Sequence, residues 1–122
     1  MFNEIFQILV LLQIKHWYID FVNQSNEEVE HKGTYFAWQG IKHSLKQGLG
    51  TWLVFCIFID PVSAFILGFF DFIAHYNIDW AKMNINKKFG YTIDKPQFWA
   101  WLGADQLAHQ LTYIGLVWLL FV

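Results

Sequence analysis

The chain has 122 residues and a net charge of −2, and it is 56% hydrophobic, 20% aromatic and 15% charged. Soluble domains are roughly 45–50% apolar and about 25% charged, so this composition is typical of a membrane protein. The length allows one domain over residues 1–122, the charge gives no reason to propose a nucleic-acid partner, and the single cysteine, Cys56, excludes internal disulfides and cysteine-based zinc motifs.

The first expected helix covers about residues 2–23, and its first half contains mostly apolar side chains. It lacks a basic leading segment and a small-residue cleavage pattern, so we expect it to be retained rather than removed as a signal peptide. The half nearer the following loop is polar: it carries Lys15, His16 and Asp20, and Gln24 follows one turn later. We expect Lys15 to extend toward the lipid headgroups.

The acidic segment 25–32 is expected to be an exposed loop in which His31 is solvated. A second helix is expected over about 35–59, with His43 in its polar first turns and an almost wholly apolar remainder. Asp60 and Pro61 then predict a turn and a new helix, because Asp is a common N-cap and Pro suits the first helical position.

The third helix is expected over about 61–83 and carries Asp71, His75, Asp79 and Lys82. A polar loop, 84–96, leads to a fourth helix at about 97–121. This last helix carries Asp105, Gln106 and His109 and is otherwise lipid-compatible.

Four apolar helices with a short middle turn predict an all-α, integral membrane four-helix bundle with up-down connectivity. The lysines gather in or beside the first and third loops, so the positive-inside tendency places these loops in the cytoplasm and both termini outside the inner membrane. Five tryptophans near the loops are expected to form an interfacial belt: Trp17, Trp38, Trp80, Trp99 and Trp101. The alternative is a soluble four-helix bundle with an unusually aromatic core.

Three histidine–aspartate pairs spaced four residues apart recur in these helices: His16 and Asp20, His75 and Asp79, and Asp105 and His109. Residues four apart share one helix face. Because the fourth helix runs opposite to the first and third, its reversed order in sequence becomes the same order in depth. The pairs are therefore expected to converge on one buried polar site, with His43 as a fourth wall and Asp71 accepting a hydrogen bond from an imidazole.

A charged aspartate inside a bilayer costs roughly 2.5–3.5 kcal/mol, so such residues indicate function. Facing carboxylates also repel one another unless they share protons or bind a cation. Imidazole and carboxylate ligands on several helices suit a divalent metal, with zinc as the first choice and iron or manganese as alternatives. Two other interpretations remain: hydrogen-bonded clamps between helices, and a proton or ion pathway.

The candidate metal ligands are the six residues of the three pairs: His16, Asp20, His75, Asp79, Asp105 and His109. His43 is a ligand or a general base, and Gln24 and Gln106 are expected to orient water or substrate. Lys82, and with it Lys32, could hold an anionic substrate or headgroup, although either lysine could equally anchor the chain at the lipid surface.

These residues resemble the pattern of a family of small bacterial and phage membrane proteins, domain-of-unknown-function family 3307. The likeness rests on four stretches in order: His16, Asp20 and Gln24 with Lys32; His43; His75, Asp79 and Lys82; and Asp105, Gln106 and His109. The resemblance implies the fold and the candidate residues but no activity. The family is also similar, by analogy only, to inner-membrane metal-dependent hydrolases.

The sequence therefore predicts a membrane-embedded metal site that hydrolyses an ester or phosphoester at the cytoplasmic side, with an anionic lipid or a phosphoester as the candidate substrate. The alternative is a non-enzymatic membrane protein, either an ion or proton conductor or a partner protein that uses the clusters as clamps. The outer halves of the helices offer few polar groups, which favours a closed pocket over a pore within one chain. A homo-oligomer could still form a pore between subunits.

Overall fold

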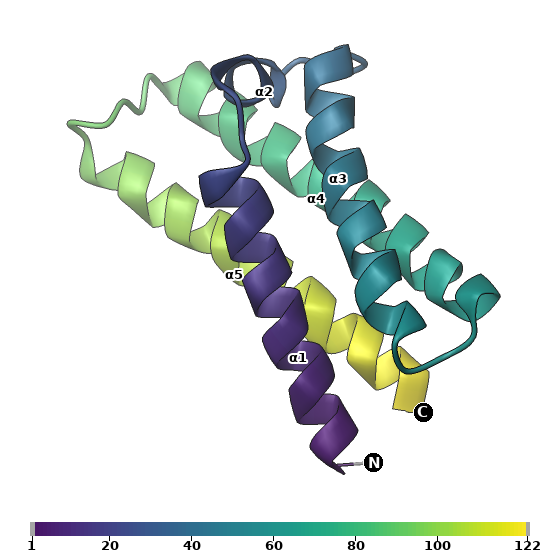
Figure 1. Ribbon diagram of the computed structural model, residues 1–122. Helices are drawn as coiled ribbons and strands as arrows, with labels where there is room; N and C mark the ends of the chain where they lie inside the picture. The colour runs from purple at the N-terminus through teal and green to yellow at the C-terminus, as the bar shows by residue number, and fades with distance from the viewer. Residues whose placement is uncertain (1, 122) are drawn as a thin grey trace.

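The structure, a computed structural model, describes residues 2–121, and the regular secondary structure within that range is all helical. In chain order the elements are α1 (Phe2–Trp17), the π-helical turn η1 (Tyr18–Val22), α2 (Asn26–His31), α3 (Trp38–Cys56), α4 (Pro61–Phe89) and α5 (Pro96–Phe121). The four long helices run up and down, with both termini and the α3–α4 turn at one end and α2 and the α4–α5 connection at the other (Figure 1). The all-α, four-helix prediction is confirmed.

The end of α4 differs from the predicted one, because we took the polar residues after position 83 as the end of the helix. We expected the third helix to end near residue 83, but α4 continues to Phe89 and ends at Gly90, whose φ of 66° is left-handed. Glycine adopts that conformation without steric cost, so it ends a helix where a run of Asn and Lys does not. The predicted start of this helix is confirmed: the Asp60 side chain accepts a hydrogen bond from Ser63 N–H, which also lowers the pKa of Asp60.

The acidic segment after η1 is mostly exposed, as predicted, but it forms the short helix α2 instead of the loop that we expected. The Ser25 hydroxyl accepts from the Glu28 N–H while the Glu28 carboxylate accepts from the Ser25 N–H, which is a capping box. Glu28 is buried and pairs with Lys46 of α3 at 2.6 Å. Burial raises the pKa of Glu28, but the bonds from Lys46 and Ser25 outweigh it and leave this pKa below its ordinary value. Half-buried His31 ends this helix.

Each long helix buries one stripe of side chains, and along the helix this stripe changes from an apolar end to a polar end. On α1 the buried positions are Ile8, Leu12 and His16, and Asp20 continues the series in η1. The stripe of α5 runs from Asp105 and His109 to an apolar end at Leu116 and Val117. The apolar ends pack together near the termini, with Ile8, Leu12, Val54, Phe55, Ala64, Leu67, Tyr113, Leu116 and Val117 as their core. The polar ends therefore meet at the other end of the bundle, below α2.

The outer surface is apolar. Among residues 2–121, thirty-two large hydrophobic side chains are exposed and thirteen polar or charged residues are buried. Soluble proteins usually show the opposite preference for charged residues, which are mostly exposed. Two helical segments, Phe2–Val22 and Pro61–Phe89, are long and apolar enough to cross a membrane by length and composition. We expected four such segments; α3 and α5 do not reach this threshold because they carry polar residues, many of which are turned inward.

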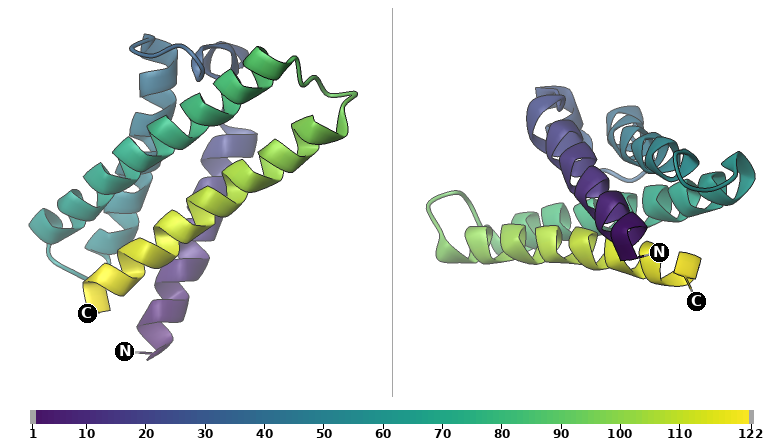
Figure 2. Two further views of the ribbon diagram at one scale, coloured as in Figure 1. Left: turned by 180° about the vertical axis from the view of Figure 1, so that it is seen from behind. Right: turned by 60° about the horizontal axis from the view of Figure 1, so that its bottom comes forward.

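Helices α3 and α4 form the closest pair in the bundle, and their antiparallel arrangement is visible from both sides (Figures 1 and 2). Glycine allows this approach: a Cβ on Gly48 would lie 2.8 Å from Phe72 Cβ and 2.9 Å from Gly68 O. The contact positions His43 of α3 and His75 of α4 on facing surfaces, so the site depends on it.

We predict that Gly48→Ala destabilises the folded protein by about 1–3 kcal/mol, because the added methyl group overpacks the α3–α4 contact. The measurement is the unfolding free energy in mild detergent. Gly115→Ala is the matched control, since a Cβ there meets nothing within 4 Å. Equal stability of the two variants would contradict the prediction.

Candidate metal centre

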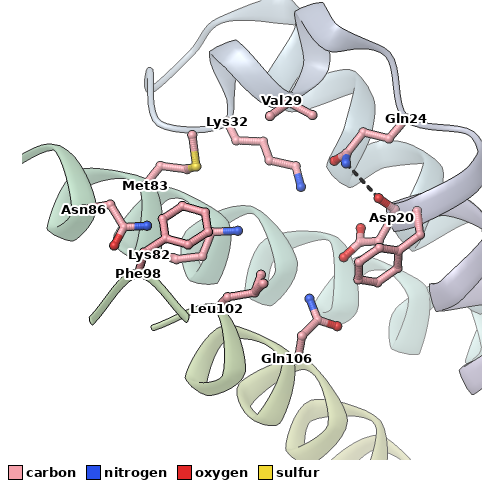
Figure 3. A pocket seen from close by; sticks show the side chains of 11 residues that line it. Asp20, Gln24, Val29, Lys32, Lys82, Met83, Asn86, Phe98, Leu102 and Gln106 are labelled. Atoms are coloured by element: carbon pink, nitrogen blue, oxygen red, sulfur yellow. Dashed lines mark hydrogen bonds between the residues drawn. The ribbon is translucent and has the colours of Figure 1, made fainter. Parts of the chain in front are cut away.

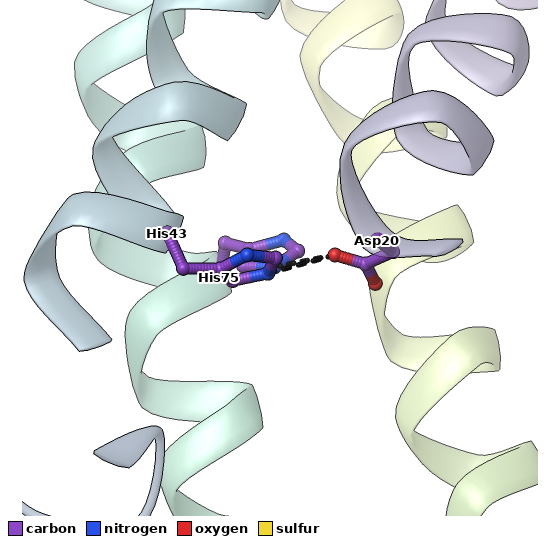
Figure 4. A group of neighbouring side chains, drawn as sticks. All are labelled: Asp20, His43 and His75. Carbon is purple, nitrogen blue, oxygen red and sulfur yellow. Dashed lines mark hydrogen bonds and ion pairs between the residues drawn. The ribbon is translucent and has the colours of Figure 1, made fainter. Parts of the chain in front are cut away.

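Asp20 lies on η1, the π-helical turn that continues α1. Such turns are uncommon and often occur at functional sites, because the extra residue per turn rotates the side chains that follow. Here the Asp20 carboxylate faces α3 and α4, where the rings of His43 and His75 extend toward it (Figure 4). All three side chains are buried. The predicted convergence of separate helices is therefore present at this point.

The first candidate metal group is Asp20, His43 and His75. The Asp20 Oδ1 atom lies 2.8 Å from His43 Nε2 and 3.5 Å from His75 Nε2. The two Nε2 atoms are 3.2 Å apart. Two ligands of a tetrahedral zinc ion, each about 2.0–2.1 Å from it, are separated by about 3.3 Å. The spacing of these three atoms therefore fits one divalent ion.

The second candidate group is His75, Asp79 and His109. Asp79 Oδ2 lies 3.1 Å from His75 Nε2, and Asp79 Oδ1 lies 3.1 Å from His109 Nε2. The ring of His75 stacks on that of His109, with centroids 4.0 Å apart. His75 is common to both groups, and its Nε2 can ligate one ion only, so the two groups are alternative or adjoining parts of one centre.

Several buried polar atoms of the centre make no hydrogen bond to any residue in the range 2–121, and they include Asp79 Oδ2 and Asp105 Oδ1. Unpaired buried carboxylate oxygens are costly, and a cation would satisfy them. His43 Nδ1 and His75 Nδ1 are also unpaired within these residues. The hydrogen-bond acceptor that usually orients a ligating imidazole is therefore not supplied by the described chain, and ring stacking takes its place at His75.

The remaining members of the predicted set border this centre. Asp105 Oδ2 lies 3.6 Å from His109 Nε2 and 3.6 Å from Lys82 Nζ. Lys32, at the end of α2, reaches Asp79 Oδ2 at 3.5 Å. His16 Nε2 lies 3.3 Å from Asp20 Oδ2, outside both candidate groups.

Two expectations about charged residues were wrong. Lys15 does not extend toward the headgroups: its side chain is 7% exposed and turns inward to pair with Asp71 at 3.3 Å. Asp71 in turn accepts from Lys15 and Thr51 rather than from an imidazole. An ammonium and a carboxylate buried together lower each other's desolvation cost, which is why Lys15 turns to the interior. Gln47 and the Tyr113 hydroxyl also accept from Lys15, at 2.7 and 3.0 Å.

This network orients His16. An ammonium can only donate, so the Tyr113 oxygen accepts from Lys15 and its one proton remains for His16 Nδ1, 2.8 Å away. His16 therefore carries its own proton on Nε2, where it faces Gln106 Oε1 at 2.8 Å and Asp20 Oδ2. A protonated nitrogen does not ligate a metal. The geometry thus favours His16 as a hydrogen-bond donor that holds Asp20.

A pocket of about 240 Å³ adjoins the centre on the side of the loops. Figure 3 shows Lys32 and Lys82 entering it from α2 and α4, and Gln106 from α5. Gln24 also lines it, but its amide nitrogen is held by the Asp20 carbonyl at 2.7 Å. Gln24, Gln106, Lys32 and Lys82 thus line the same cavity from different sides.

Sequence reasoning missed Gln47, Thr51 and Tyr113, although a signal for them exists. His43, Gln47 and Thr51 are spaced four residues apart on α3, as are Asp105, His109 and Tyr113 on α5. Extending each polar series by one or two further turns would have identified these residues. The inward turn of Lys15 leaves no such signal, because it depends on Asp71 of a different helix.

A family model described as "Protein of unknown function (DUF3307)" matches residues 8–122. No curated protein and no solved structure is similar enough to the chain to count as a match.

We predict that Lys15→Met lowers the unfolding free energy by about 3–5 kcal/mol, because it leaves the buried Asp71 carboxylate without its cation. The double variant Lys15→Met/Asp71→Leu should recover most of this loss. Detergent unfolding monitored by circular dichroism measures both. Exposed Lys42 on α3 supplies the control, Lys42→Met, which should stay within about 0.5 kcal/mol of the parent.

We further predict that His16 is protonated on Nε2 and not on Nδ1, which NMR of the ring nitrogens can report directly. Tyr113→Phe removes the donor to Nδ1 and should shift His16 toward a mixture of the two tautomers. The ring of His31, which lies in α2 outside the cluster, should not change. An Nδ1-protonated His16 in the parent protein would refute the assignment.

Proposed function

The chain belongs to the DUF3307 family, and from its buried site we propose that it is a membrane-embedded, metal-dependent hydrolase acting on an ester or phosphoester. One observation carries the metal assignment. Asp20, His43 and His75, from three separate elements, bring one oxygen and two nitrogens to within 2.8–3.5 Å of one another in a buried position. Zinc, iron and manganese all accept this set of donors, and zinc suits it best.

The membrane placement is supported by the distribution of polarity. The bundle buries its carboxylates and imidazoles and exposes apolar stripes, such as Phe6, Val10 and Ile14 along α1. An apolar exterior of this extent is stable in lipid. All five tryptophans of the proposed interfacial belt are exposed. We infer a multi-pass protein of the inner membrane, with the site in the half of the bilayer nearer the lysine-rich loops and with both termini outside.

The chain's own residues supply the other requirements of hydrolysis. A bound divalent ion would provide the Lewis acid that polarises a substrate oxygen and acidifies water. His43 is a ligand in the group with Asp20, and His109, whose Nε2 lies 3.1 Å from Asp79 Oδ1, is a ligand in the adjoining group. Gln106 and Gln24 line the approach from the pocket and orient water or substrate there. The closed apolar core below the site keeps water from passing through the bundle.

A second candidate function is a structural clamp without an ion. It is favoured by the ion pairs that Lys32 makes with Asp79 and Lys82 makes with Asp105, since these already compensate part of the buried charge. Such pairs join different helices and could serve only to hold the bundle. The metal content of the purified protein distinguishes the two functions.

We predict that protein purified in mild detergent and supplied with zinc, iron and manganese in turn retains about one or more equivalents of one of them, as the three-ligand group requires. His75→Ala, which removes the residue common to both candidate groups, should lose this metal and hydrolysis of chromogenic phosphate and carboxylate esters. Elemental analysis measures the metal, and circular dichroism checks that the variant is folded.

His31→Ala removes a histidine outside the cluster and should keep both metal and activity. Parent protein that holds no metal, together with a His75→Ala variant that only unfolds more easily, would support the clamp and overturn the hydrolase. Metal retained in folded His75→Ala would remove His75 from the ligand set.

A further inference from the structure

The pocket beside the metal centre is lined by two lysines whose ammonium groups make no hydrogen bond within residues 2–121. Lys32 and Lys82 come from different elements, and their side chains are 7% and 13% exposed. Each lies near a carboxylate oxygen, at 3.5 Å from Asp79 Oδ2 and 3.6 Å from Asp105 Oδ2, which is too long for a hydrogen bond. Neither ammonium donates a hydrogen bond to a residue of the described part of the chain. Ammonium groups with free donors on the wall of a largely apolar cavity indicate an anion site.

The charge of the centre determines when this site can hold an anion. Three buried carboxylates, Asp20, Asp79 and Asp105, lie beside the two ammoniums, and without a cation they repel an incoming anion. A divalent cation adds two positive charges and weakens this repulsion. It also competes directly with Lys32, because Asp79 Oδ2 faces Lys32 at 3.5 Å and His75 Nε2 at 3.1 Å. An oxygen that ligates a cation has less charge to offer Lys32.

The lining of the pocket indicates which class of anion Lys32 and Lys82 would bind. Its other residues are mainly apolar, among them Phe21, Val29, Phe98 and Leu102. Three of its amides, on Gln24, Asn86 and Gln106, add polar atoms, and both Gln24 Oε1 and Asn86 Oδ1 have no partner among residues 2–121. A phosphoryl group has several non-bridging oxygens that can face two ammoniums and a cation at once, whereas a carboxylate has two. The apolar walls would contact the organic part of the molecule.

We propose that Lys32 and Lys82 form a phosphoryl clamp that becomes competent when a divalent cation occupies the adjoining His/Asp centre. The proposal rests on the proposed function and names its substrate class, a phosphoester. The phosphoryl group is held between the two ammoniums and the cation, and its apolar substituent lies against the α5 and η1 walls. Both a lipid headgroup and a soluble phosphate compound offer this chemistry.

The test measures binding of inorganic phosphate by calorimetry to detergent-purified protein, with the metal loaded and after its removal by a chelator. We expect at least a tenfold increase in affinity on loading. Lys32→Gln/Lys82→Gln is tested in the metal-loaded form, in which the cation compensates the two carboxylates, and its folding is checked by circular dichroism. It should lose at least tenfold while keeping the metal content of the parent, and Lys82→Gln alone, which removes the more exposed lysine, should lose affinity in the same direction. Lys87→Gln/Lys88→Gln, which removes two exposed lysines at the end of α4, is the charge-matched control and should bind phosphate as the parent does.

Metal-loaded protein whose phosphate affinity is unchanged in Lys32→Gln/Lys82→Gln would overturn the clamp and leave the metal site standing. Equal phosphate affinity with and without metal would overturn the proposed dependence of phosphate binding on the cation. Protein that takes up no metal would instead overturn the proposed function.

A second arm compares glycerol phosphate with short-chain phosphatidic acid below its aggregation limit. Tighter binding of the lipid assigns a headgroup to the clamp, and equal or weaker binding assigns a soluble phosphate compound. Failure of both to compete with inorganic phosphate would exclude phosphoesters as its ligands.

Discussion

The structure depends on the pairing of charges that the bundle buries. Lys15 pairs with Asp71, Lys32 with Asp79, and Lys82 with Asp105. Each pair joins α4 to a different element, so α4 is the helix on which the polar half of the bundle is assembled. A buried charge without its partner is strongly destabilising. The relative positions of α1, α2 and α5 around α4 are therefore restricted by electrostatics as well as by packing.

The two ends of the long helices have different roles: one end packs the apolar core, and the other carries the His/Asp centre. The ends near the termini pack Ile8, Leu12, Phe55 and their neighbours and contain no imidazole or carboxylate among the buried core residues. The ends near the loops hold the His/Asp centre. Apolar packing at one end stabilises the bundle without using polar groups, so the other end can hold a buried carboxylate oxygen that makes no hydrogen bond to residues 2–121, such as Asp105 Oδ1. A site of this kind is expensive in stability, and the packed half offsets the cost.

Much of this arrangement could be predicted before the structure. The spacing of four between His and Asp and the opposite direction of the fourth helix were sufficient to predict that His75, Asp79 and His109 would meet. Local signals also located the start of α4 at Pro61. Predictions failed where the same local sequence pattern is compatible with two different structures. An acidic segment can be a loop or a capped helix, and a lysine near a helix end can extend to the headgroups or pair with a buried carboxylate, as Lys15 does.

The sequence by itself determined the helical class, the order of the helices and the residues that converge, because periodicity and polarity are properties of each segment alone. Only the tertiary structure decided which atoms face one another. It placed His43 Nε2 at 2.8 Å from Asp20 Oδ1, turned Lys15 to Asp71, and brought Lys32 and Lys82 to one pocket. These outcomes depend on the relative rotation of helices and on the π-helical turn at Asp20. Packing between segments sets both, and no single segment encodes it.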